Sequence, residues 1–410
     1  MKKAAWLVMA VVPAGWSYPL DGAARTGIRR LTGYQLANEG KIARTLALPP
    51  GALLRSGQVV LRLKGKSDSF DINGSTRQDP YLQSGLERIF GRRDPSYGIA
   101  VLDITNPADP KYAVVRGDLK RIPGSVGKLM VATGMFDAVA RAYPEPAARE
   151  KFLRETVVTG DSFVHRDGKT VPFFNSGDKA IVNRRLEIGD RFNLWEWMDH
   201  MLSQSSNAAA AFTWKQAMLL REFGKAYPVP KDQESAFFAR KRELLAKSLE
   251  VNESALRAAG LDTDKLRIGT FFTSGGSSVV PGTASYACPT ELLRWLIRVE
   301  QGRLVDAWSS LEIKRLLYFA RPRYRYASSP ALAKAAVFFK SGSLFECESG
   351  RRCTPYKGTV TNLMHSVAIV ESGEKVYLVA MMSNILGVNS AVEHQIVAGE
   401  IERLIQSRPK

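Results

Sequence analysis

The sequence is poor in the residues that build metal centres and disulfide frameworks. It has 3 cysteines and 4 histidines in 410 residues, and no group of them has the spacing of a structural zinc site. Three cysteines are also too few to hold a small fold together by disulfides. We therefore expect neither a bound metal nor an organic cofactor.

Long apolar runs, internal repeats and low-complexity segments are missing as well. Hydrophobic residues make up 45% of the chain and charged residues 24%, which is ordinary for a globular protein. This composition excludes a disordered chain, a collagen-like chain and a multi-pass membrane protein. Acidic residues are fewer than basic ones, 40 against 58, and the net charge of +18 favours anionic partners such as nucleic acid, lipid or cell-wall polymer.

Nucleic acid is the least expected of these partners, because lysine and arginine are spread along the chain and no binding motif is present. An anionic cell-envelope surface remains an expected partner. A nucleotide-binding loop around Lys128 is excluded, since Ile122 stands where its glycine should be and Leu129 where its hydroxyl residue should be. The sequence also lacks the Gly-x-Ser-x-Gly turn of histidine-dependent serine hydrolases and the His-Glu-x-x-His zinc motif.

The N-terminus predicts export. Lys2 and Lys3 give it a positive start, residues 4–12 are apolar, and small or turn-forming residues follow. The apolar run is too short to span a bilayer comfortably. We predict a signal peptide over residues 1–17 and a periplasmic or secreted protein, with a buried N-terminal strand or helix as the alternative.

Export permits disulfides. Cys347 and Cys353 flank a short polar segment, which predicts a loop-closing disulfide, with two free thiols as the alternative. Cys288 would remain unpaired.

Hydrophobic periodicity divides the rest of the chain into two parts. Residues 18–85 have little helical periodicity and form a predicted N-terminal extension, with a strand at 59–63. Residues 86–410 form the predicted catalytic domain. We expect strands at 97–104, 112–115, 337–340, 365–370 and 376–382, helices beginning near 125, 194 and 289, mostly helical structure over 213–265, a Gly/Ser-rich loop over 271–287, and a last helix opened by a capping box of Ser390 and Glu393. This order predicts an α+β fold, an antiparallel sheet flanked by helices beside an all-helical subdomain.

Three short motifs occur in the order Ser125-Val-Gly-Lys128, Ser205-Ser-Asn207 and Lys340-Ser-Gly342. Ser-x-x-Lys also occurs at two other places, but only Ser125 follows a Pro-Gly turn and opens a helical pattern. Residues three apart on a helix share a face, which brings the lysine amine within reach of the serine hydroxyl. For Ser125 alone a helix N-cap is the alternative. The placement of the motifs on a helix start, a loop after a helix and an apolar strand favours a catalytic site.

The set of motifs resembles the signature of penicillin-binding proteins and class A β-lactamases. The resemblance extends from about residue 86 to 404 and implies a β-lactamase/transpeptidase-like domain. It implies a serine hydrolase that forms an acyl-serine with an amide substrate. We rank hydrolysis of β-lactams first and a penicillin-binding D,D-carboxypeptidase or transpeptidase acting on D-Ala-D-Ala peptidoglycan stems second. A non-catalytic cell-wall-binding protein on the same fold is the third alternative.

Four residues receive catalytic roles from this resemblance. Ser125 is the nucleophile, and Lys128 is its base if a desolvated site and a nearby positive charge keep its amine neutral. Lys340 supplies that charge, and Ser205 relays the proton to the leaving nitrogen.

Four further residues are expected to bind the substrate. Asn207 holds its side-chain amide, and Ser341 with Lys340 holds its carboxylate. Gly342 leaves the strand edge bare so that the substrate lies alongside it. The backbone N–H groups of Ser125 and Ser343 form the oxyanion hole.

Two departures bear on the substrate. Ser206 stands where class A β-lactamases usually carry aspartate, and residues 267–287, where their deacylating glutamate lies, contain no acid. Glu243, Glu250 and Glu253 are predicted to lie on a solvated helix face. The departures weaken the expectation of fast β-lactam turnover and keep the D,D-peptidase hypothesis close behind.

Overall fold

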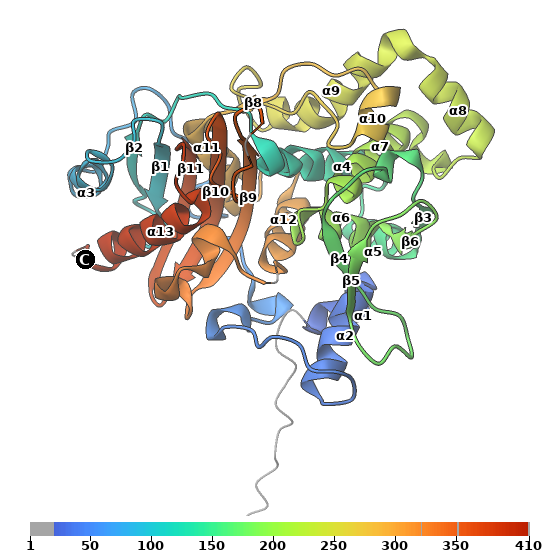
Figure 1. Ribbon diagram of the computed structural model, residues 1–410, viewed down its shortest axis with the longest axis horizontal. Coiled ribbons are helices and arrows are strands. Elements are labelled where there is room, and N and C mark those ends of the chain that lie inside the picture. Colours follow the sequence, from blue (N-terminus) through green and yellow to red (C-terminus); the bar gives the residue numbers. More distant parts are fainter. Residues whose placement is uncertain (1–19, 321, 351, 409–410) are drawn as a thin grey trace, which may run out of the picture.

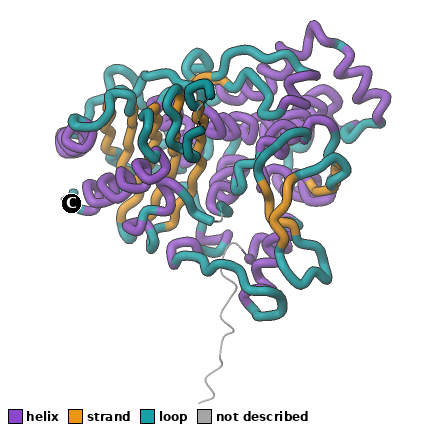
Figure 2. The backbone as a smooth tube through the Cα atoms, in the orientation of Figure 1, coloured by secondary structure: helices purple, strands orange, loops and turns teal. Residues whose placement is uncertain are grey.

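The computed structural model describes residues 20–320, 322–350 and 352–408, so the predicted signal peptide lies outside the described residues. Figure 1 shows a sheet with its covering helices beside a mainly helical half, and Figure 2 shows most of the strands gathered on one side. No helix among the described residues combines the length and apolar character needed to cross a membrane.

A five-stranded antiparallel sheet forms one half, in the order β2-β1-β11-β10-β9. Its strands are β1 (Gly98–Asp103), β2 (Lys111–Val115), β9 (Ala336–Glu346), β10 (Thr361–Ser372) and β11 (Lys375–Asn384). All five strands predicted for the catalytic domain are confirmed, and β9, β10 and β11 are longer than expected. Strand β9 lies at the edge of the sheet that faces the helical half (Figure 1).

The two faces of the sheet are covered by different helices. Along β1, Ile99 and Val101 belong to one hydrophobic cluster, and Ala100 and Leu102 belong to the other, because successive side chains point to opposite faces. The first cluster includes α3 (Pro80–Phe90) and α13 (Ser390–Gln406), and the second includes α11 (Pro289–Glu300). The sheet is therefore buried on both sides.

Helix α4 (Lys128–Ala142) is the centre of the helical half. It packs against α6 (Leu194–Leu202), α7 (Asn207–Phe223) and α9 (Lys241–Ala258), and nearly all of its side chains are buried, as expected for a helix surrounded by others. The predicted helices near residues 125, 194 and 289 and over 213–265 are confirmed.

The remaining elements complete both halves. They are α1 (Ala23–Thr26), α2 (Arg29–Asn38), α5 (Pro146–Glu155), α8 (Lys231–Ala239), α10 (Ser274–Val279) and α12 (Ala307–Tyr318), the strand pairs β3 (Val157–Thr159) with β6 (Arg191–Asn193), β4 (Thr170–Phe173) with β5 (Val182–Arg185) and β7 (Leu266–Arg267) with β8 (Tyr286–Ala287), and 3-10 turns including η4 (Gly124–Gly127), η5 (Ser162–Val164) and η7 (Arg325–Ser328).

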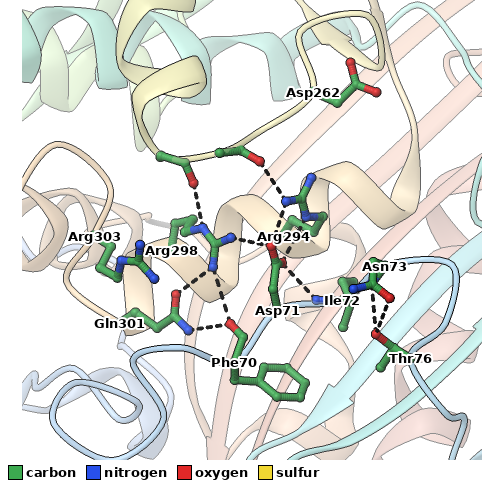
Figure 3. A network of polar contacts seen from close by, with 12 residues as sticks. Phe70, Asp71, Ile72, Asn73, Thr76, Asp262, Arg294, Arg298, Gln301 and Arg303 are labelled. Carbon is green, nitrogen blue, oxygen red and sulfur yellow. Dashed lines mark hydrogen bonds and ion pairs between the residues drawn. The ribbon is translucent and has the colours of Figure 1, made fainter.

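The N-terminal segment, residues 20–79, packs on both halves. Arg30 of α2 forms a fully buried ion pair with Asp199 of α6. Farther along, the Asp71 carboxylate accepts hydrogen bonds from Arg294 at 2.7 Å and Arg298 at 2.5 Å, both on α11 (Figure 3). The segment is thus held to the helical half at one end and to the sheet's covering helix at the other.

The strand predicted at 59–63 is wrong. The backbone N–H groups of Leu63 and Lys64 donate to the Glu300 carbonyl at 3.1 and 3.0 Å. This carbonyl belongs to the C-terminal end of α11, whose last carbonyls have no partner within the helix. Val59 and Leu63 are buried against the domain without a strand partner, whereas Val60 is exposed.

Two other local predictions need correction. The 271–287 loop contains α10 and strand β8, and Thr273 opens α10 by accepting a hydrogen bond from Gly276 N at 3.1 Å. The last helix has no capping box of Ser390 and Glu393, because Asn389 is its N-cap and its side chain accepts from the N–H groups of Ala391 and Val392.

Candidate active site

The three motifs meet where β9 passes the start of α4. Ser125 lies in the 3-10 turn η4, and Lys128 is the first residue of α4. The Ser125 side chain makes no N-cap hydrogen bond. Ser205 ends the connection from α6 to α7, and Lys340 lies in the middle of β9. Ser125, Ser205 and both lysines are all buried.

The Lys128 amine has three close partners. Its Nζ lies 2.8 Å from Ser125 Oγ, 2.8 Å from the Ser205 carbonyl oxygen and 2.7 Å from Asn207 Oδ1. The last two atoms only accept hydrogen bonds. A neutral amine donates its two hydrogens to them and turns its lone pair to the Ser125 hydroxyl, which is the arrangement of a base on a nucleophile.

Electrostatics favour the neutral form of Lys128. Burial lowers its pKa well below the usual value, and the charges of Lys169 and Lys340 lower it further. Lys340 donates to Ser205 Oγ at 2.7 Å and to the Ser341 carbonyl at 3.0 Å. Burial and the charges of Lys169 and Arg325 also hold the pKa of Lys340 well below its usual value. Two of the predicted residues therefore share one desolvated cluster.

Lys169 is a site residue that the sequence did not indicate. It precedes β4 on a polar turn, and its Nζ lies 2.7 Å from the Ser205 carbonyl, 3.2 Å from Ser205 Oγ and 3.4 Å from Ser125 Oγ. Burial and the charge of Arg325 lower its pKa to about 8. Nothing in its local pattern distinguishes this lysine from those on the surface.

Arg325 is the second residue that was missed. Its Nη1 donates to Ser341 Oγ at 2.8 Å and its Nη2 to Ser343 Oγ at 2.9 Å. The guanidinium also lies 4.9 Å from the Tyr356 ring centre. In sequence it is one of several arginines in a basic stretch, which gives no sign of its position beside the third motif.

Asp167 explains the serine in the middle of the second motif. Its Oδ2 accepts hydrogen bonds from Ser206 Oγ at 2.7 Å and from the backbone N–H groups of Asn207 and Ala208 at 2.7 and 2.9 Å. A carboxylate at the start of α7 is favoured by the helix dipole. A carboxylate from a separate loop thus holds the second motif and the start of α7.

The backbone of the site is unusual at two positions. Ser205 and Arg325 have left-handed φ angles of 59° and 55°, which cost a residue with a side chain about 1–3 kcal/mol each and are held only by their surroundings. These conformations turn the Ser205 carbonyl towards the two amines and the Arg325 side chain towards β9.

The sequence predicts that Gly342 leaves the strand edge bare for the substrate, but in the structure the turn that carries Ser125 lies against it. A Cβ atom there would lie 2.7 Å from the Pro123 carbonyl, 2.9 Å from Val126 N and 3.0 Å from Ser125 N. The glycine therefore lets β9 pack directly against the turn that carries Ser125, and the strand at this residue is covered by that turn. This contact also brings Ser343 beside the Ser125 turn.

A phenyl ring faces the Lys128 amine. The Phe272 ring centre lies 4.8 Å from Lys128 Nζ. Glu243 and Glu250 are exposed as predicted, but Glu253 is buried and pairs with Arg257 and Arg267. Among the described residues no carboxylate forms an ion pair with Lys128, Lys169 or Lys340, and no group of His, Cys, Asp and Glu could hold a metal ion.

A cavity of about 470 Å³ opens beside the cluster. Lys169, Ser205 and Arg325 line it, together with Tyr324 and Tyr356. The cavity gives a substrate access to the cationic side of the site. Cys347 and Cys353 form a disulfide with their Cα atoms 6.0 Å apart, and Cys288 is buried and unpaired.

Comparison with known proteins identifies the fold. No protein-family model matches the chain, and no curated protein matches it. Its fold is that of penicillin-binding proteins and class A β-lactamases.

Three solved structures carry this likeness. A mutant of PBP-A in an acyl-enzyme complex with penicillin G matches with a TM-score of 0.51 and 12% identity, over 81% of this chain and 98% of that one. A β-lactamase from Chitinophaga pinensis matches with 0.51 and 16%, over 80% and 98%. The TLA-3 extended-spectrum β-lactamase matches with 0.53 and 12%, over 79% and 96%. At these identities the likeness establishes the fold alone.

Proposed function

We propose that the protein is a serine acyl-enzyme that binds β-lactams covalently at Ser125 and acts on D-alanyl amides of peptidoglycan stems. The observation that carries this proposal is the 2.8 Å contact between Lys128 Nζ and Ser125 Oγ, made by a fully buried lysine without a carboxylate partner in the described chain. A lysine kept neutral in this way is a competent base for a serine hydroxyl.

The acylation step follows from the hydrogen bonds. Ser125 Oγ attacks the amide carbonyl carbon, and its proton passes to Lys128 Nζ. As the carbon–nitrogen bond breaks, a proton reaches the leaving nitrogen through Ser205 Oγ, which lies 3.5 Å from Lys128 Nζ and 2.7 Å from Lys340 Nζ. Backbone N–H groups of Ser125 and Ser343 stabilise the oxyanion. Water then cleaves the ester and restores the hydroxyl.

Arg325 supports a substrate with a carboxylate. It brings two N–H donors to the hydroxyls of Ser341 and Ser343, and it has no ion-pair partner among the described residues. A planar guanidinium beside two hydroxyls suits a carboxylate, which accepts several hydrogen bonds at once. Both β-lactams and D-alanyl-D-alanine peptides carry a carboxylate next to the scissile amide. Asn207 bonds Lys128, and we assign it substrate contact as a second role.

A long-lived acyl-enzyme is better supported than rapid β-lactam hydrolysis. The phenyl ring of Phe272, not a carboxylate, lies against Lys128. The oxygens of the nearby Asp167 carboxylate accept hydrogen bonds from Ser206 and backbone N–H groups. Without an acid to activate water, deacylation of a bulky penicilloyl ester is slow. This favours the penicillin-binding D,D-peptidase over the β-lactamase that we ranked first.

Covalent labelling tests the proposal. The protein is mixed with a fluorescent penicillin and followed by gel fluorescence and intact mass, and with nitrocefin to measure turnover. We expect one acyl adduct per chain, lost in Ser125→Ala and kept in Ser176→Ala, which alters the serine of another Ser-x-x-Lys sequence. Absence of labelling in the natural protein contradicts the proposal and favours a non-catalytic wall-binding protein, whose binding weakens with salt.

Fast nitrocefin turnover without a lasting adduct would instead make β-lactamase activity the favoured function.

We also infer export to the cell envelope from the N-terminal pattern. Amino-terminal sequencing of the mature protein tests that inference, and a start near residue 18 is the expected result.

A further inference from the structure

We propose that Lys169 is a third catalytic lysine, whose ammonium group carries the positive charge of the Ser125 site and keeps Lys128 in its neutral, proton-accepting form. The catalytic role of Lys169 rests on the proposed function, in which Ser125 is the nucleophile. The assignment of the charge rests on the geometry of the amines.

Three amines surround one serine. Lys128, Lys169 and Lys340 all have Nζ within 3.5 Å of Ser205 Oγ, and Lys128 and Lys169 also bond the same carbonyl oxygen. Like charges at such short range disfavour each other's protonation, most strongly where water is excluded. The cluster therefore does not hold three ammonium groups at neutral pH.

Burial decides which amine is charged. Lys128 and Lys340 are fully buried, whereas Lys169 is half-buried and lines the cavity. Charging an amine costs least where solvent still reaches it. A proton on Lys169 exchanges with water in the cavity, which the two buried amines do not contact.

Hydrogen bonding agrees with this assignment. The three contacts of Lys169 Nζ, with the carbonyl and hydroxyl oxygens of Ser205 and with Ser125 Oγ, match the three N–H donors of an ammonium group. Lys128 has two obligate acceptors, the close Ser125 hydroxyl and a longer contact of 3.5 Å with the Ser205 hydroxyl, so a neutral amine has acceptors for both hydrogens and a hydroxyl facing its lone pair. Burial is the main cause of the lowered pKa values of Lys128 and Lys340, and the charge of Lys169 lowers both further.

The other charged groups around the cluster do not replace Lys169. Arg325, on η7, adds positive charge and bonds the hydroxyls of β9. Asp167, on the same turn as Lys169, binds the start of α7 and the Lys169 backbone N–H. During acylation Lys128 takes the Ser125 proton and passes it on, while Lys169 stays charged beside the developing oxyanion and the leaving group.

Lys169→Met tests the proposal because it removes the charge and keeps the length of the side chain. The acylation rate with a fluorescent penicillin is measured against pH. We expect the acidic limb of the profile to move up by one pH unit or more, which slows acylation about tenfold on that limb, while the rate at high pH stays within a few-fold. Lys169→Arg should keep the limb in place, and Lys179→Met, in the exposed β4–β5 connection, should change nothing.

A direct titration separates this proposal from the proposed function. Lysines labelled with carbon-13 at Cε are followed by NMR, and the Lys128 and Lys169 signals are assigned by their loss in Lys128→Met and Lys169→Met. In the natural protein at pH 7 we expect Lys128 to be neutral and Lys169 to be largely charged, with Lys128 titrating at higher pH in Lys169→Met. This readout needs no substrate, so it judges Lys169 even if no β-lactam acylates the protein.

Two results overturn the proposal. One is an unchanged acidic limb in Lys169→Met, and if the high-pH rate is also lost, Lys169 only positions the Ser205 loop. The other is a Lys128 signal that is charged at pH 7 in the natural protein, and this result stands even if the methionine variant fails to fold, with assignment then made in Lys169→Arg.

Discussion

Arg325 and Ser341 lie 16 positions apart in sequence, and the guanidinium Nη1 donates to the serine hydroxyl at 2.8 Å. The contact joins η7 to the third motif and places a cation without an ion-pair partner in the described structure on the cavity wall. In the proposed function, the Arg325 guanidinium binds the substrate carboxylate.

Arg325→Gln should lower the efficiency of acylation by a penicillin about ten- to hundredfold, because a hydrogen bond to a charged group contributes about 1.5–3 kcal/mol. The measurement is the second-order rate of fluorescent labelling. The methyl ester of the same penicillin lacks the carboxylate and should react equally with both proteins. An equal loss for acid and ester would show that Arg325 holds the site together without binding the carboxylate.

Gly342→Ala should displace the turn that carries Ser125, because the new methyl group would lie within 3.0 Å of three backbone atoms. Overpacking of this kind costs about 1–3 kcal/mol. We expect a lower midpoint of thermal unfolding and at least a hundredfold slower acylation. Gly57→Ala is the matched control, since nothing lies within 4 Å of its added Cβ. Unchanged labelling of the Gly342 variant would contradict the close approach of β9.

Phe272→Glu should shorten the life of the acyl-enzyme at least tenfold, because it places a carboxylate base where the ring now contacts Lys128. The decay of the penicilloyl adduct is followed by intact mass, and nitrocefin hydrolysis should rise in parallel. Phe272→Gln has similar size without a base and serves as control. Equal decay in both variants would mean that loss of the ring, and not general-base catalysis, admits water.

Asp71→Asn should lower stability by about 1–3 kcal/mol at pH 7, because it leaves Arg294 and Arg298 without their shared carboxylate (Figure 3). Burial opposes ionisation of Asp71, but the Arg294 hydrogen bond and the Arg298 charge outweigh it and lower its pKa below 3.8.

The lowered pKa gives the pH dependence its sign. The carboxylate stabilises the fold above the unfolded-state pKa, and this contribution is lost as the pH falls through the folded-state pKa. Urea unfolding at pH 7 and pH 3 measures it: the difference in stability between natural protein and variant should shrink at pH 3. Asp68→Asn, exposed and outside the network, is the control, and a difference that is constant with pH would contradict the ion-pair account.

Periodicity predicted most of the elements that build the sheet and the helical half, because burial on one face of a strand or helix repeats along the chain. It failed at residues 59–63, where Val59 and Leu63 are buried without a strand partner and the backbone instead bonds the end of α11. It also missed the N-cap role of Asn389, since Ser390 and Glu393 fit the same local pattern. Such choices depend on contacts that a short window of sequence does not contain.

The sequence by itself determined the pair of Ser125 and Lys128, because residues three positions apart on one helical turn have their side chains close together. It also located the second and third motifs. Only the tertiary structure decided that Lys169, Arg325 and Asp167 join them, since Asp167 and Lys169 come from one turn and Arg325 comes from η7, and β9 packs against both η4 and η7. Loop residues have no period that reports their direction, so their charges enter the site only when the chain is folded.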